Sequence, residues 1–502
     1  MISKPVIERV LLFVGLVALS LLVYRSGLHI PYYADDYQRL FTNPDEAMRH
    51  AFTKANPFDA SYRPLEAFSL GFIQSHWGWD TFPFRLLNLL FHAAGALLVF
   101  HALRYWKIST ITALRAAVFV IILQMGAAAI LGNDTQSQVT GAFFSALSLW
   151  LLYRSLESGS LQLWRYAGSI IFFFLALLSK ETSSGLALGV AFLCYTFSKK
   201  ENVAGKIGDS IIKLVPYGIC VLAYWLLRSN AGAISPTLGN ANLSLNLGAN
   251  IPINIGLFMI QSVLPISSMA VVKAFQYRDH LLLALIFVLT SAFTLAMFFG
   301  AIRSGRKKLA LGLVVLLFFS WFPAILLNHI GELYAYNSIF LIGALFGIAF
   351  EYYRTSFSKR PVILGVSLLM IIVAFTNYSG VEEKASSMKE QGDRAAIFLP
   401  QLISLAQKMP QNEWMYLAGP KDTSFYYSMF RIQGFRVSAL SDSVVRFFSG
   451  RPDVRVYVAD SASCAKLAKT YPGILFTFDP ADFRIYPMPE SGPENNKLKM
   501  IR

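Results

Sequence analysis

Residues 77–106, WGWDTFPFRLLNLLFHAAGALLVFHALRYW, contain a predominantly apolar run at about 86–103. A run of this length is close to the ~20 residues with which an α-helix crosses a bilayer. Runs of the same kind recur along the chain, at roughly 10–24, 110–131, 138–153, 166–179, 184–198, 210–227, 281–302, 309–327, 335–350 and 361–376. The pattern predicts a polytopic α-helical membrane protein with about 11 spans, or up to about 13 if residues 251–272 also cross.

The composition agrees with this class. Of the 502 residues, 55% are hydrophobic and only 15% are charged, whereas soluble domains carry about 25% charged residues. The net charge is +15, which in a soluble protein would suggest nucleic-acid binding. Here Lys and Arg lie mostly in short loops between apolar runs, as expected for positive-inside topology, so no nucleic-acid partner is expected.

The charge pattern predicts the orientation of the chain. With the N-terminus inside, the basic loops all fall on the inner side, at 104–115, 154–165, 199–213, 303–308 and 354–360. The opposite short loops, 132–137 and 328–334, contain no Lys or Arg. This alternation satisfies the positive-inside rule.

Two domains are expected. Residues 1–377 would form a membrane domain, with outer loops at 25–85 and 229–280. Within the second loop, 251–272 is either a pair of spans or a helix in the interface. The tail, 378–502, alternates helix-like and β-rich runs, which predicts a small α/β domain outside the membrane.

An acidic pair, Asp35 and Asp36, follows the first apolar run in HIPYYADDYQRL. Its neighbours Tyr32, Tyr33 and Tyr37 suit the membrane interface. Adjacent residues of an extended segment point to opposite sides, so one Asp would face a substrate while the scaffold or a metal holds the other. The alternative is a solvated loop pair without a role.

Basic residues are expected at the same outer level. Arg63, in SYRPLEAF, is restrained by Pro64 to extended geometry and is suited to phosphate, or else forms a structural ion pair. Lys180 ends FFFLALLSKET and Arg228 ends YWLLRSN. Both are candidates for binding a lipid phosphate. The alternative for Lys180 is a snorkelling side chain beside Glu181.

Glu181 and four further residues are supporting candidates. Asn88 and His92 lie four residues apart and share a helix face, where they serve either helix–helix hydrogen bonds or catalysis. Glu332 and Tyr336 have the same spacing at the start of the next-to-last expected span. Their charged and polar groups would lie at the same membrane level as the acidic pair.

At these residues the chain resembles GT-C-fold glycosyltransferases, the membrane enzymes that use polyprenyl- or dolichyl-phosphate sugars and include the protein-mannosyltransferase-like superfamily. The resemblance rests on the acidic pair, on YRPL with the following 77–106 region, on LALLSKET and on GELYAYNSIFL. It covers patches of about the first 350 residues. Leu333 and Asn337 depart from the family pattern, which has Arg and Pro there.

The resemblance implies a catalytic base at Asp35 or Asp36 and donor-phosphate binding by Arg63, Lys180 and Arg228. Glycosyl transfer from a phosphate donor needs charge neutralisation on the leaving phosphate and a base for the acceptor hydroxyl. A single displacement would invert the anomeric centre. A divalent metal held by the two acids stays open. No Gly-rich nucleotide loop is present, so no nucleotide cofactor is expected.

The expected partners are a polyprenyl-phosphate-linked sugar, membrane lipids and an acceptor glycan, lipid or protein. The expected location is the inner membrane of a bacterium, with the site and the C-terminus periplasmic. The alternatives are another lipid-linked glycan enzyme (a polymerase or ligase), a glycolipid transporter or flippase, or a non-catalytic assembly protein acting through residues 378–502. A transporter would be expected to show internal repeats, and the sequence has none of that kind.

Overall fold

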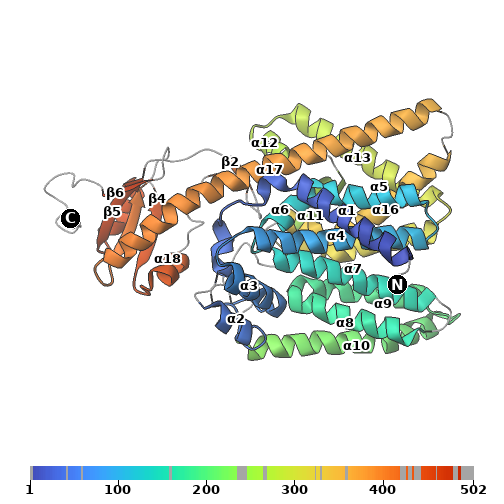
Figure 1. Ribbon diagram of the computed structural model, residues 1–502, viewed down its shortest axis with the longest axis horizontal. Coiled ribbons are helices and arrows are strands. Elements are labelled where there is room, and N and C mark those ends of the chain that lie inside the picture. Colours follow the sequence, from blue (N-terminus) through green and yellow to red (C-terminus); the bar gives the residue numbers. More distant parts are fainter. Residues whose placement is uncertain are drawn as a thin grey trace.

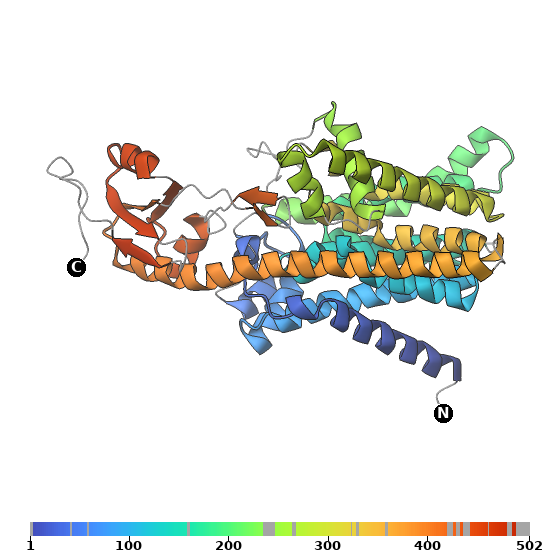
Figure 2. The same cartoon turned by 90° about the horizontal axis from the view of Figure 1, so that it is seen from above.

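The computed structural model describes residues 4–487 except for 41–42, 58–59, 158–160, 234–245, 264–267, 323, 328–330, 357–359, 419–424, 428–431, 435–441, 460 and 479–483. A helical bundle forms the larger part, and a small sheet lies beyond one end of it (Figure 1). One long helix, α17, runs along the bundle and on to the sheet (Figure 2).

Among the described residues, six helices are long and apolar enough to cross a membrane. They are α1 (Lys4–Val23), α4 (Phe82–Tyr105), α7 (Gln136–Glu157), α10 (Val203–Asn230), α13 (His280–Arg303) and the segment α15–η7–α16 (Glu332–Ala335, Tyr336–Ser338, Ile339–Ser356). A seventh span arises if α5 (Thr110–Ile122) and the following 124–131 segment, bent by 45°, cross together. The membrane class is therefore confirmed.

The expected count of eleven spans is not confirmed. Three of the expected spans correspond to shorter helices, α8 (Leu163–Ser179), α9 (Leu186–Thr196) and α14 (Lys307–Trp321). The 11 residues of α9 rise only about 17 Å, against a hydrocarbon core of about 30 Å. The expected runs at 184–198 and 309–327 extend over the 3₁₀ turns η4 (Glu181–Gly185) and η6 (Ala324–Leu326), and a hydropathy pattern does not separate a helix from such a turn.

The first outer loop folds into short helices at the sheet-facing end of the bundle (Figure 1). They are η1 (Arg25–Gly27), η2 (Ala34–Arg39), α2 (Pro44–His50) and α3 (Pro64–Trp77). Proline opens both α2 and α3, because its missing N–H costs nothing in the first helical turn. The 251–272 segment lies in α11 (Asn250–Val263) and α12 (Ser268–Gln276), each too short to span.

The chain breaks its helical path between α5 and α7. Here η3 (Gln124–Gly126) and α6 (Ala127–Leu131) lead into a non-helical loop at 132–135. This loop is buried, so its backbone N–H and C=O groups need partners inside the protein. Those partners form the candidate site described below.

Helix α17 (Arg360–Lys408) has 49 residues and is about 73 Å long. It contains both the expected last span, 361–376, and the helix-like stretch 395–409 up to its final residue. The expected domain boundary at 377/378 therefore falls inside one continuous helix. The division into two domains at that position stays a prediction.

The C-terminal sheet has the strand order β4-β1-β5-β6. The central strand β1 (Trp414–Ala418) pairs in parallel with β4 (Arg455–Ala459) and β5 (Gly473–Phe478), while β6 (Ile485–Pro487) is antiparallel to β5. Helices α18 (Asp442–Ser449) and α19 (Ser461–Ala468) accompany it, and β2 (Phe425–Tyr427) pairs with β3 (Ile432–Gly434). Three expected β-rich runs are confirmed, and the run 435–440 lies outside the described residues.

Candidate active site

Basic residues of two of the expected inner loops lie at the end of the bundle away from the sheet. At the end away from the sheet, Arg154 lies 3.7 Å above the Tyr105 ring and Arg306 Nε donates to the Trp106 carbonyl at 3.1 Å. At the sheet-facing end lie the polar loops that carry the candidate residues (Figure 1). Which end faces outward stays a prediction.

Asp36 is fully buried, and four N–H donors surround its carboxylate. Oδ1 accepts from the backbone N–H of Asn133 at 2.9 Å and of Asp134 at 3.1 Å. Oδ2 accepts from Asn133 Nδ2 at 3.0 Å and from Tyr33 N at 3.3 Å. A carboxylate offers about four lone-pair sites, so Asp36 is saturated and holds the 132–135 loop in place.

The same loop is held from its carbonyl side by α4. Arg85 Nε donates to the Leu131 carbonyl at 2.7 Å. Asn88 Nδ2 donates to the carbonyls of Ile130 at 3.2 Å and Gly132 at 3.1 Å. Asn88 is therefore a buried helix–loop anchor, and α4 together with Asp36 fixes the loop that lies between them.

Asp35 lies beside Asp36 in η2, but its side chain is outside the described part of the structure. A metal site at the acidic pair was left open by the sequence. With four N–H contacts on its two oxygens, Asp36 has no lone pair to offer a cation. No group of three or more His, Cys, Asp or Glu side chains within the described ranges is arranged to hold a metal.

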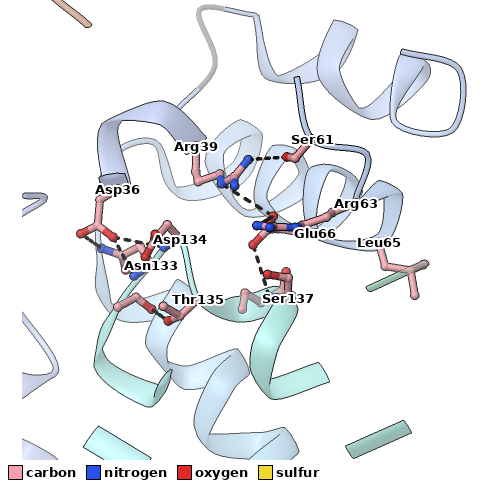
Figure 3. Close-up of polar contacts among 12 residues, drawn as sticks. Asp36, Arg39, Ser61, Arg63, Leu65, Glu66, Asn133, Asp134, Thr135 and Ser137 are labelled. Carbon is pink, nitrogen blue, oxygen red and sulfur yellow. Dashed lines mark hydrogen bonds and ion pairs between the residues drawn. The ribbon is translucent and has the colours of Figure 1, made fainter. Parts of the chain in front are cut away.

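Arg63 forms a bidentate ion pair with Glu181. Its Nε and Nη2 lie 3.0 and 2.8 Å from the two Glu181 oxygens. Its Nη1 is also 3.8 Å from Glu66, a buried residue that sequence reasoning did not single out. Glu66 further lies 3.7 Å from Arg39 and accepts from the Ser137 backbone at 3.3 Å (Figure 3). The Arg63 guanidinium group, which was expected to bind phosphate, is thus paired with Glu181.

Lys180 follows the last residue of α8 and is only 5% exposed. Its Nζ lies 6.0 Å from the centre of the Tyr334 ring. Burial lowers the pKa of Lys180 to about 8; the nearby Arg63 cation acts in the same direction, and Glu181 and Glu66 oppose it. The ammonium is therefore close to losing its proton just above neutral pH.

Arg228 lies in the last turn of α10 and is 4% exposed. The turn before it is tied to the outer loop, since Tyr224 Oη donates to the Tyr62 carbonyl at 3.2 Å. Just beyond it, the Ala55 backbone N–H donates to the Ala231 carbonyl at 3.0 Å. The structure thus brings the ends of α8 and α10 to the segment that carries Arg63.

The other supporting candidates form a separate group. His92 Nδ1 lies 3.0 Å from Tyr336 Oη, inside the bundle. Glu332 pairs with Lys384, and both are buried. Lys384 also donates to the Gln124 carbonyl at 3.1 Å. The Lys384 contacts tie α17 to the core, and Lys384 is a residue that sequence reasoning missed.

No family model matches the chain, and no curated protein matches its sequence. Among solved structures, the chain is similar to ArnT from Cupriavidus metallidurans bound to undecaprenyl phosphate, at 13% identity and a TM-score of 0.52 over 94% of this chain and 93% of that one. The apo state of ArnT matches at 13% identity and 0.52, over 95% and 94%. The mycobacterial arabinofuranosyltransferase AftD matches at 15% and 0.48, over 89% and 31%. The two ArnT matches, over nearly the whole length of both chains, show that this protein has the GT-C fold of membrane glycosyltransferases.

Proposed function

We propose that this protein transfers a sugar from a polyprenyl-phosphate-linked donor to an acceptor at the outer face of the membrane, with inversion. The observation that carries the proposal is the arrangement at one end of a GT-C bundle. There, nearly buried cations at the ends of α8 and α10 lie around the loop that contains Arg63. The undecaprenyl phosphate in the ArnT structure supports a lipid phosphate as the ligand.

Lys180 and Arg228 are the proposed phosphate-binding groups. Each is a cation at a helix end that is almost fully removed from water. An incoming phosphate would form charge-assisted hydrogen bonds with these two groups, which are stronger in such a low-dielectric setting than in water. Arg63 has a different role, because its guanidinium group already forms a bidentate ion pair with Glu181. It contributes positive charge and fixes Glu181 beside Lys180.

Asp35 is the proposed base, because Asp36 has its lone pairs engaged. Asp36 is then a positioning residue, because it holds the 132–135 loop against η2, the element that also contains Asp35. The acceptor hydroxyl would give its proton to Asp35 while its oxygen attacks the anomeric carbon. The bond from that carbon to the phosphate oxygen breaks, and the lipid phosphate leaves with the electron pair.

The test is transfer from a defined polyprenyl-phosphate sugar by the purified protein. Asp35→Asn should lower kcat by about 10²–10⁴, the usual loss for a positioned base. Lys180→Ala should raise the donor KM by about 10–100-fold, as expected when a charge-assisted contact is lost. The matched controls are Asp45→Asn and Lys54→Ala, two exposed residues of the same loop. Wild-type kinetics in both site variants would contradict the proposal.

The proposed orientation places this end of the bundle on the periplasmic side of a bacterial inner membrane. Single cysteines test it with a membrane-impermeant thiol reagent on intact cells. Lys54→Cys, in the outer loop, should be labelled, whereas Lys200→Cys, beyond the opposite end of α9, should not. The reverse labelling pattern would invert the orientation, and NMR of the product anomer would test inversion independently.

A further inference from the structure

A cavity of about 430 Å³ lies inside the bundle, between α4, α7, α9, α14 and α16. Its volume is in the range of pockets that hold one small ligand. On α4 its lining begins at Leu98, which is 13 residues beyond Arg85 and hence about 20 Å further along the helix axis. On α4 the cavity therefore lies nearer the end of the bundle opposite Arg85, and its wall reaches Phe340, whose ring centroid is 6.4 Å from that of His92.

The walls of this cavity are almost entirely apolar. Leucine and aromatic side chains predominate, among them Leu149, Phe192, Leu316 and Phe340, and among the described residues that line it Lys308 is the charged one. Water finds too few hydrogen-bond partners in such a space to be retained. Gly312 leaves further room, since a Cβ added there would meet only Phe192, at 3.8 Å. A ligand that fills the cavity must be hydrocarbon over most of its length.

One end of the cavity has the character of a membrane interface. Trp106, Trp150 and Tyr153 line it there, with ring centroids of adjacent pairs 5.8 Å apart. Such aromatic residues concentrate where hydrocarbon meets headgroups. Lys308 lines the same end, and Arg306 is held beside it through the Trp106 carbonyl. The charge at this end favours an anionic headgroup.

We propose that this cavity binds one acyl chain of an anionic phospholipid, whose headgroup phosphate pairs with Lys308. The hydrocarbon chain fills the apolar space between α14 and the α4–α7 pair, and the phosphate stays at the interface among the aromatic rings. The site is separate from the proposed phosphate-binding residues, because Lys180 precedes α9 whereas the cavity lining on α9 begins at Phe192, six residues after the first residue of that helix. It does not depend on the proposed glycosyl transfer.

Native mass spectrometry of the purified protein, after incubation with phosphatidylglycerol or phosphatidylethanolamine of the same acyl chains, tests the proposal. Lys308→Gln removes the charge, and Lys307→Gln is its control because Lys307 does not line the cavity. Gly312→Leu fills the space, and Gly312→Ala is its control because the added carbon has ordinary room. Thermal unfolding of each variant shows whether it is folded.

The wild type should retain one phosphatidylglycerol in preference to phosphatidylethanolamine. Lys308→Gln should lower that retention about fivefold, the contribution of one lysine near an anionic headgroup, while Lys307→Gln should not. Gly312→Leu should abolish retention of both lipids, and Gly312→Ala should preserve it. Unchanged retention in Gly312→Leu, or equal effects of the two lysine variants, would overturn the site. Displacement of the phospholipid by polyprenyl phosphate would instead assign the cavity to the tail of that lipid.

Discussion

Replacing Asp36 by asparagine tests whether this carboxylate positions the loop or acts as the base. Asparagine keeps the shape but turns one oxygen into an NH₂ group that no longer accepts hydrogen bonds. The least costly orientation puts the NH₂ at the Oδ2 position, opposite Asn133 Nδ2 and Tyr33 N. The Asn133 amide can then rotate, because its own Oδ1 is buried without a hydrogen-bond partner.

The magnitude follows from this count of contacts. After rotation of Asn133, the variant loses only the contact from Tyr33 N, which at 3.3 Å is the longest of the four. Loss of one buried contact costs about 1–3 kcal/mol. Asp36→Ala removes the acceptor for all four donors and should cost more than Asp36→Asn. Thermal unfolding of the purified variants should show this order.

A swap variant separates the two roles. In Asp36→Asn/Asn133→Asp, the new amide at position 36 donates to the new carboxylate at position 133, a charge-assisted contact that the single variant lacks, while the contact from the Tyr33 N–H to position 36 is not restored. If Asp36 only positions the loop, the swap should restore part of the thermal stability and part of the transfer activity that Asp36→Asn loses. If Asp36 is the base, activity should stay about 10²–10⁴ below the wild type although stability returns. That second result would refute the assignment of the base to Asp35.

Three further outcomes are expected. Because Lys180 has a pKa of about 8, its ammonium is present below that pH and is lost above it. The donor KM should therefore rise as pH increases through about 8. Lys180→Arg should flatten this dependence of the donor KM on pH, because arginine stays charged. A donor KM that does not change with pH in the wild type would exclude Lys180 from phosphate binding. Arg228→Ala should raise the donor KM about 10–100-fold, and Arg228→Lys should recover only part of the affinity because the planar fork is lost; full recovery would show that charge alone suffices. Lys384→Met should destabilise the protein by about 3–5 kcal/mol, because it removes the buried ammonium that pairs with Glu332. Adding Glu332→Gln should recover part of that loss in thermal unfolding. Simple additivity of the two losses would show that the residues are not coupled.

Local patterns in the sequence predicted local structure well. Apolar runs became helices, and the runs at 413–419, 454–460 and 474–478 became β1, β4 and β5. The alternation of the spans also predicted that the charged helix ends would lie together at one end of the bundle. These features depend on neighbours in the chain, which is why the sequence alone was sufficient.

The pairing of charges could not be predicted in the same way. Arg63 meets Glu181 across 118 positions of the chain, and no local pattern distinguishes that partner from a bound phosphate. The sequence around Lys384 does contain a pattern that indicates its burial. It shares a helical stripe with Val381, Ala385 and Met388, all buried, and a lysine within such a stripe indicates a buried partner.

The loop at 132–135 has a consequence for how the protein is made. Its N–H groups bind Asp36, 97 or 98 positions earlier in the chain, while its Gly132 carbonyl accepts from Asn88 on a helix synthesised between the two. The segment that contains Asp36 is therefore synthesised before the loop whose N–H groups it binds. These hydrogen bonds can form only after α4 and α5 have been synthesised. A nascent chain that stalls before this point has its acids without the contacts that order them. Under the proposed function, the ordering of this part of the site would thus depend on correct insertion of the N-terminal helices up to α5.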